Sequence, residues 1–149
     1  MIHLKRTDSD NSHFQLLVRD LDVELKVRDG DDHAFYAQYN KTVNIKYVVV
    51  VFENEEAVGC GAIKEFDAVT MEVKRMFVPF NQRGQGIAGL VLAELEKWAS
   101  EMGYKKCILE TGEKQPEAIR LYSKSGYTII PNYGQYEGVE ASKCFEKIL

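Results

Sequence analysis

The sequence predicts an α/β fold in which helices flank a mixed, mostly antiparallel central sheet, in the order β-α-α-β-β-β-α-β-α-β-β. Three observations support this prediction. Residues 46–78 contain strand-like runs separated by closely spaced turns, the pattern of an antiparallel meander. Apolar residues at helical spacing mark 12–28 and 87–102 as amphipathic helices. Beyond residue 103, strand-like runs enclose one further helical pattern.

Length and composition indicate a globular protein with a single domain, residues 1–149. The chain is 45% hydrophobic and 28% charged, and at this length it buries roughly 70% of its unfolded surface. The net charge is −4 and no Lys/Arg-rich block occurs, so we expect no nucleic-acid partner. The longest apolar run, 47–52, is too short to cross a bilayer, and the N-terminus lacks an apolar core of signal-peptide length. We therefore expect a cytoplasmic protein without a membrane partner.

The cysteines and histidines indicate neither disulfide nor metal chemistry. The three cysteines are widely spaced in apolar strand-like runs, and none of the three histidines has ligand spacing with them. We expect reduced, buried thiols and no metal site. The cysteines are Cys60, Cys107 and Cys144.

The elements of the N-terminal half follow from local patterns. A short first strand is expected at 2–6. The amphipathic helix at 12–28 ends at an Asp-Gly pair, and a second short helix is expected at 33–40. Three strands follow, and glycines flank the cysteine of the second one. These strands are expected at 46–53, 57–66 and 69–78.

The second half begins where Pro79 stops the third strand of the meander. After a glycine-rich turn at 82–89, the apolar stripe of 87–102 predicts a helix. Pro116 just inside its start and Gly126 just past its end delimit the last helix. The remaining strands are expected at 106–111, 127–130 and 142–148, with a Gly/Tyr-rich loop at 131–138.

The glycine-rich turn, Q-R-G-Q-G-I-A-G at 82–89, is the most informative stretch of the chain. A turn of this kind that opens a helix offers free backbone N–H groups and the positive end of the helix dipole to a phosphate. The stretch fits two fingerprints. From Gly84 it reads G-x-G-x-x-G, the dinucleotide signature. From Arg83 it reads R-x-x-G-x-A, which resembles the pyrophosphate loop of acetyl-CoA-dependent N-acetyltransferases. A tight turn without a ligand is the third interpretation.

The dinucleotide interpretation has one observation in its favour and three against it. Glu110 lies about 20 positions further on, where an acidic ribose ligand is expected. However, the strand before the glycines, 70–76, carries charges, whereas a Rossmann strand is buried on both faces. Residues 79–83 separate this strand from the first glycine. The chain after Gly89 is also too short for a second mononucleotide-binding half and a substrate domain.

A second motif favours the acetyltransferase interpretation. Residues 115–127 read Q-P-E-A-I-R-L-Y-S-K-S-G-Y, close to the pattern N-x-x-A-I-x-L-Y-x-K-x-G-F. Together with E-V-K-R-M-F-V at 72–78 and the R-x-x-G-x-A turn, this resembles the GNAT family of N-acetyltransferases over about residues 46–130, and implies a GNAT-like fold. The chain departs from the family at Gln115, where Asn is usual, and in the variable loop after the motif. Gly89 is then a helix residue that serves close packing.

The resemblance implies acetyl-CoA as co-substrate. Backbone N–H groups of the turn would cradle its pyrophosphate, with Arg83 adding a charge-assisted contact. The family splays the strand before the turn from the next strand, which frees an edge to pair with the pantetheine arm. Lys124 would reach toward the nucleotide end. The expected cofactor-binding residues are Met76, Phe77, Val78, Arg83, Gly84, Gln85, Gly86, Ile87, Ala88 and Gln115.

The implied reaction is attack of a neutral amine on the thioester carbonyl, with the Val78 N–H as the candidate oxyanion donor. Tyr122 is expected to protonate the departing thiolate, as its counterpart does in the family; the alternative is a core aromatic. Glu72 is expected to act as the base or to hold its water, because a carboxylate in a partly dry cleft tends toward a raised pKa. Alternatively, Glu72 is a solvated residue paired with Lys74 on the same face of the strand. Glu110 is the competing candidate for the base.

The sequence constrains the acceptor least. Aromatic residues in the N-terminal helices and the 131–141 loop hint at a compact pocket, which His33 could line, and the acidic net charge favours a cationic acceptor. We therefore predict an acyltransferase acting on a primary amine of a small molecule, such as an amino acid or a polyamine. A non-catalytic acyl-CoA-binding module and a protein or peptide N-acetyltransferase are the alternatives. Many family members are dimers, which leaves a homodimer open. The aromatic residues are Phe35, Tyr36, Tyr39, Tyr133 and Tyr136.

Overall fold

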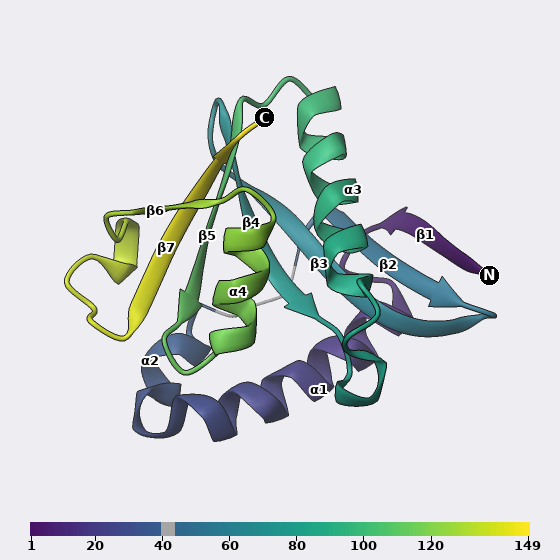
Figure 1. Cartoon of the computed structure of the whole chain (residues 1–149), viewed down its shortest axis with the longest axis horizontal. Coiled ribbons are helices and arrows are strands. Elements are labelled where there is room, and N and C mark those ends of the chain that lie inside the picture. Colours follow the sequence, from purple (N-terminus) through teal and green to yellow (C-terminus); the bar gives the residue numbers. More distant parts are fainter. Residues whose placement is uncertain (40–43) are drawn as a thin grey trace.

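In the computed structural model, which describes residues 1–39 and 44–149, helices cover both faces of a seven-stranded sheet (Figure 1). The helices are α1 (Ser12–Asp29), α2 (His33–Ala37), α3 (Ile87–Glu101) and α4 (Pro116–Lys124). The strands are β1 (Ile2–Thr7), β2 (Tyr47–Glu53), β3 (Glu56–Asp67), β4 (Thr70–Phe77), β5 (Lys106–Gly112), β6 (Thr128–Ile130) and β7 (Ser142–Ile148).

The order of elements confirms the predicted fold class. The strands lie in the order β1-β2-β3-β4-β5-β7-β6, and β4 and β5 form the parallel pair of an otherwise antiparallel sheet. Most predicted boundaries agree to within one or two residues. The short second helix ends earlier than predicted, at Ala37, and residue 40 of the predicted range lies outside the described residues.

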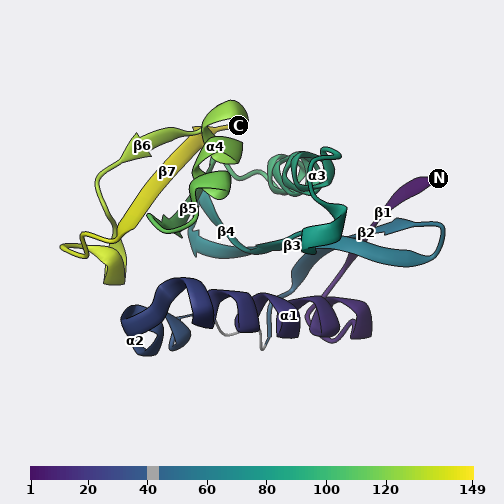
Figure 2. The same ribbon diagram turned by 60° about the horizontal axis from the view of Figure 1, so that its bottom comes forward.

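The two layers of helices bury the two faces of the sheet in separate cores. Figure 2 shows α1 and α2 on one face and α3 and α4 on the other. β2 reads as a continuous apolar run because alternate residues serve both cores. Val48 and Val50 pack in the core beneath α1, and Val49 and Val51 pack in the core beneath α3.

Two glycines of β3 let α3 lie close to the sheet. A Cβ at Gly59 would approach the Ile87 side chain to 2.7 Å, and one at Gly61 would approach Val91 to 2.8 Å. Both approaches are closer than packed side chains allow. Because Ile87 is the first residue of α3, this packing also fixes where the glycine-rich turn ends.

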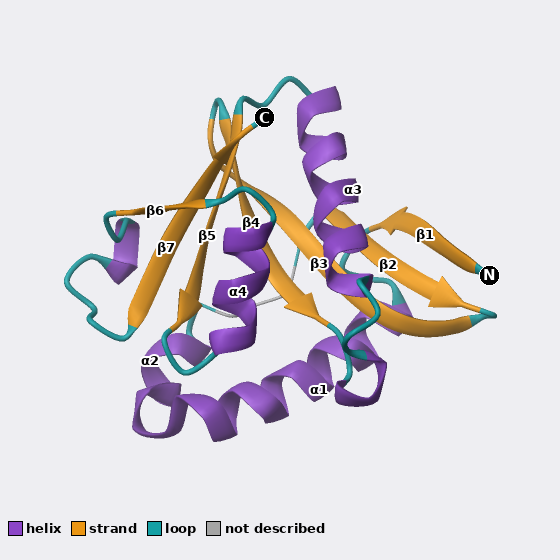
Figure 3. Ribbon diagram, viewed as in Figure 1, coloured by secondary structure: helices purple, strands orange, loops and turns teal. Residues whose placement is uncertain are grey.

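A bulge in β4 separates it from β5. Between the pairs Cys60↔Phe77 and Ala62↔Lys74, β4 has one residue more than β3, and Arg75 adopts the left-handed conformation at φ 58°. A bulge of this kind bends its strand. β4 consequently pairs with β5 only at 70–72, and the two strands then diverge (Figure 3). This is the splay that the family resemblance implied.

Two other sequence expectations concern the cysteines and the membrane. The three cysteines are free and buried, as predicted. Within the described ranges, 1–39 and 44–149, no helix has the length and apolar character needed to cross a membrane.

Candidate active site

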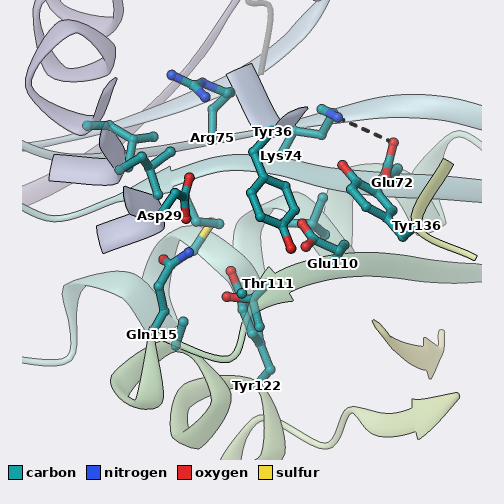
Figure 4. Close-up of a pocket in the computed structure, with 16 residues that line it drawn as sticks. Asp29, Tyr36, Glu72, Lys74, Arg75, Glu110, Thr111, Gln115, Tyr122 and Tyr136 are labelled. Atoms are coloured by element: carbon teal, nitrogen blue, oxygen red, sulfur yellow. Dashed lines mark ion pairs between the residues drawn. The ribbon is translucent and has the colours of Figure 1, made fainter. Parts of the chain in front are cut away.

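Two adjoining cavities open where β4 and β5 diverge. The first, of about 290 Å³, lies between the glycine-rich turn, the end of β4, and α4, and is called the glycine-turn pocket below. The second, of about 110 Å³, lies between α1, α2, β4 and β5, and is called the carboxylate pocket (Figure 4). The residues that line both are Leu21, Met76, Gln115, Ala118 and Tyr122.

The glycine-rich turn has the backbone geometry that the sequence predicted for it. Gly84 and Gly86 have φ angles of 82° and 79°, a conformation that glycine adopts without strain. Gly86 caps the N-terminus of α3 without a side chain, so the helix presents unobstructed N–H groups to the pocket. Nine of the ten predicted cofactor-binding residues line this pocket; Gln85 is the exception. Lys124 does not line it either.

Gly89 has a different role from the one predicted. A Cβ at this position would meet no atom within 4 Å, so the predicted packing role is wrong. Gly89 instead lines the glycine-turn pocket. Here the missing side chain leaves space for a ligand rather than for a neighbouring element.

The Arg83 side chain is already engaged within the protein. Its Nε donates to the Val78 carbonyl oxygen at 2.8 Å, and its Nη2 donates to both oxygens of Glu24 at 2.8 and 3.0 Å. Arg28 lies 3.7 Å from the same carboxylate and also pairs with Glu117 of α4. This ionic chain links the turn, α1 and α4 beside the pocket. A phosphate that recruits the guanidinium must compete with Glu24.

Tyr122 lies at the junction of the two pockets. The residue is 6% exposed and packs in the core beneath α3 and α4. Burial, together with the nearby charge of Glu110, raises the pKa of its hydroxyl well above the ordinary value. Tyr122 is therefore a core aromatic whose protonated hydroxyl lies at the boundary of a cavity. Its role as the acid stays a prediction.

Glu110 is the most perturbed carboxylate in the carboxylate pocket. It lies on β5 two residues beyond the last pair with β4, Glu72↔Ile108. Burial raises the pKa of Glu110 to about 7, and a hydrogen bond from the Ser142 hydroxyl opposes that rise. Its Oε2 is buried without a hydrogen-bond partner among the described residues. Ser142 is itself 2.8 Å from the Tyr36 hydroxyl, so two buried hydroxyls are linked beside this carboxylate.

Glu72, the carboxylate predicted as the base, is occupied by other partners. Its Oε2 accepts a hydrogen bond from the Tyr133 hydroxyl at 2.6 Å, and its Oε1 lies 3.7 Å from the Lys74 ammonium (Figure 4). The two strand residues share a face, as predicted. Both Glu72 and Lys74 line the carboxylate pocket, so the structure brings the two candidate bases into one cavity.

Sequence reasoning missed Asp29 as a pocket residue. Its position before Gly30 indicated only the end of a helix, and it is indeed the last residue of α1. The structure makes it 5% exposed and part of the wall of the carboxylate pocket (Figure 4). No pattern in the sequence distinguishes it from an ordinary helix-terminating aspartate.

The predicted aromatic residues gather as expected, but few of them line the cavity. Tyr36 and Tyr136 do so, with ring centroids 6.5 Å apart. Three others pack around them: Phe35 and Tyr39 contact one another, and Tyr133 contacts Tyr136. His33 does not line the pocket.

Comparison with known proteins identifies the family. Residues 13–127 match the model of the acetyltransferase (GNAT) family. The chain belongs to the GNAT family. This GNAT protein is 39% identical over 93 residues to the IAA acetyltransferase of Azospirillum brasilense. The match covers 62% of the chain and 61% of that protein, so the chain spans about three fifths of this relative's length.

Solved structures share the fold of this GNAT protein. A provisionally named acyl-CoA N-acyltransferase from Klebsiella pneumoniae has a TM-score of 0.84 at 26% identity, with 100% of this chain and 98% of that chain covered. A GNAT acetyltransferase from Elizabethkingia anophelis, solved with acetyl-CoA bound, has a TM-score of 0.71 at 21% identity, with 99% and 98% covered. The second likeness concerns the fold alone.

Proposed function

We propose that this GNAT protein transfers an acetyl group from acetyl-CoA to a primary amine of a small molecule, by direct attack within a ternary complex. The main support for this proposal is that the two pockets meet at Tyr122. One pocket has a glycine-rich turn for a pyrophosphate, and the other holds a carboxylate with a pKa of about 7.

The glycine-turn pocket would hold the donor through backbone groups. N–H groups of the turn and the first turn of α3 face the pyrophosphate, and the edge of β4 freed by the bulge pairs with the amides of the pantetheine arm. The Val78 N–H, which has no backbone partner among the described residues, is our candidate donor to the thioester oxyanion.

Two side chains would move the protons. Glu110 takes a proton from the ammonium of the acceptor, and the resulting amine forms the N–C bond to the acetyl carbon. As the C–S bond breaks, the electron pair stays on sulfur and the Tyr122 hydroxyl gives its proton to the thiolate. The nitrogen loses its second proton as the amide forms, and this proton, passed through water, replaces the one that Tyr122 gave; the proton on Glu110 is released to solvent. A base with a pKa near the working pH, and an acid that stays protonated there, suit these two tasks.

We favour Glu110 over Glu72 as the base because Glu72 already accepts from Tyr133 and faces Lys74. The prediction that Glu72 is the base stays open to the same test. The test compares the pH dependence of kcat/KM in Glu72→Gln and Glu110→Gln. Only the variant that lacks the catalytic base should lose the rise of kcat/KM with pH.

The proposal is tested by measuring thiol release from acetyl-CoA with a panel of amines, amino acids and peptides. Tyr122→Phe should lower kcat by about 10²–10⁴-fold. Tyr127→Phe is the matched control, since Tyr127 is also buried, packs edge-to-face against Tyr122 with ring centroids 5.8 Å apart, and lines neither pocket. Unchanged turnover in Tyr122→Phe would refute the role of Tyr122 as the acid that protonates the thiolate.

A non-catalytic acyl-CoA-binding module is the competing function. It predicts that acetyl-CoA raises the melting temperature while no amine promotes thiol release. If NADH raised the melting temperature and acetyl-CoA did not, the result would favour the dinucleotide interpretation instead.

A further inference from the structure

We propose that the carboxylate pocket selects an acceptor with two ammonium groups on a short aliphatic chain: Glu110 deprotonates the amine that is acetylated, and Asp29 binds the second ammonium. This inference rests on the proposed acetyl transfer and specifies its acceptor.

Asp29 has the surroundings of a ligand-binding carboxylate. The residue is 5% exposed, lines the pocket, and has no hydrogen-bond or ion-pair partner in the described part of the chain. A buried carboxylate without a partner is costly, and burial raises the pKa of Asp29 accordingly. The charges of His33 and Lys114 act against that rise, but neither residue lines the pocket. An entering cation would supply the missing partner.

The positive charges in the pocket wall are already neutralised. Lys74 faces Glu72 at 3.7 Å, and the Arg75 guanidinium, 2% exposed, donates to Asp22 at 2.5 Å. Among the described residues that line the pocket, no cation is left to pair with a carboxylate of an acceptor. An amino acid would therefore place its own carboxylate near Asp29 and Glu110 without compensation.

The remainder of the wall suits methylene groups between two ammonium ions. Leu21 and Leu25 of α1 provide an apolar side, and the rings of Tyr36 and Tyr136 provide surfaces that attract cations. Figure 4 shows Asp29 and Glu110 on opposite sides of the Tyr36 ring. The volume of about 110 Å³ admits a compact chain and disfavours a peptide.

The experiment measures kcat/KM for thiol release with short α,ω-diaminoalkanes and with 1-aminoalkanes of the same length. We expect the best diamine to exceed its monoamine by about 10- to 100-fold, the effect of one hydrogen bond to a charged group. L-Lysine, which adds a carboxylate to a diamine, should be a poorer acceptor than the matching diamine.

Two variants test whether Asp29 is responsible for the preference for diamines. Asp29→Asn should remove most of the advantage of the diamine over the monoamine, mainly through a higher KM for the diamine. Asp31→Asn, an exposed aspartate two residues away, is the control and should keep the preference. Should Asp29→Asn fail to fold, the comparison of amines on the wild-type protein still decides the question.

The possible outcomes separate this inference from the proposed function. Acetylation of monoamines or amino acids as efficiently as diamines, or an Asp29→Asn variant that keeps the preference, would overturn the role of Asp29 and leave acetyl transfer intact. Bound acetyl-CoA without acetylation of any amine would overturn the proposed function, and this inference with it.

Discussion

Replacing Glu110 by Gln should make the protein less active and, at neutral pH and above, more stable. Glutamine keeps the size of the side chain and its hydrogen bond with Ser142, but it has no charge to bury. As the proposed base is lost, kcat/KM should fall by about 10²–10⁴-fold at pH 8. In the wild type, kcat/KM should rise with pH and level off above about pH 7, the pKa of this carboxyl.

The effect on stability follows from the same pKa. The carboxyl has a pKa of 4.5 as a free side chain and about 7 in the folded protein. Below pH 4.5 it is protonated in both states, so burial costs nothing extra. Between pH 4.5 and 7 the folded state keeps a proton that the unfolded state has lost, and stability falls as pH rises. At about 1.4 kcal/mol per unit, the 2.5-unit difference amounts to roughly 3 kcal/mol above pH 7.

Urea unfolding of the wild type and Glu110→Gln at pH 5 and pH 8 measures this difference. The free energy of unfolding of the variant, relative to the wild type, should increase by about 2.5 kcal/mol from pH 5 to pH 8, because the unfolded carboxyl is already largely ionised at pH 5. A relative stability that is independent of pH would refute the raised pKa. A raised stability with unchanged kcat/KM would refute Glu110 as the base and favour Glu72.

Three further perturbations test other parts of the site. Ser142→Ala removes a hydrogen bond that lowers the pKa of Glu110, so the rise of kcat/KM with pH should move to higher pH while the plateau changes little. Glu24→Gln frees the Arg83 side chain, and acetyl-CoA should bind more tightly at low salt by isothermal titration, with the gain lost at high salt. Gly61→Ala places a Cβ 2.8 Å from a side-chain methyl of α3, and should lower the free energy of unfolding by about 1–3 kcal/mol in urea.

The sequence predicted most of the fold because local patterns decide it. The alternation and the tight turns of 46–78, and the helical stripes at 12–28 and 87–102, each arise from neighbouring residues and keep their meaning in the folded protein. The glycine-rich turn is another local feature, since its positive φ angles depend on glycine alone. The family resemblance then supplied the relation between this turn and the helix at 116–124.

The parts of the site that the sequence did not predict depend on distant contacts. Arg75 adopts a left-handed conformation that arginine does not favour, and its guanidinium is held by Asp22, 53 residues earlier in the chain. Asp29 becomes a pocket residue only because α1 crosses beneath β4 and β5. Gly89 fits a packing role by spacing, and only the position of the pocket reveals the open space beside it.

The divergence of β4 from β5 leaves a strand edge inside the molecule instead of at its rim. Exposed edges invite pairing with other chains, but here α4 lies beside the diverging strands and lines the pocket at this edge (Figure 3). In the proposed function, the pantetheine arm of acetyl-CoA would complete the sheet at this edge in each catalytic cycle. Amide hydrogen exchange would follow this completion directly: residues 76–78 should exchange quickly in the free protein and slowly once acetyl-CoA is bound.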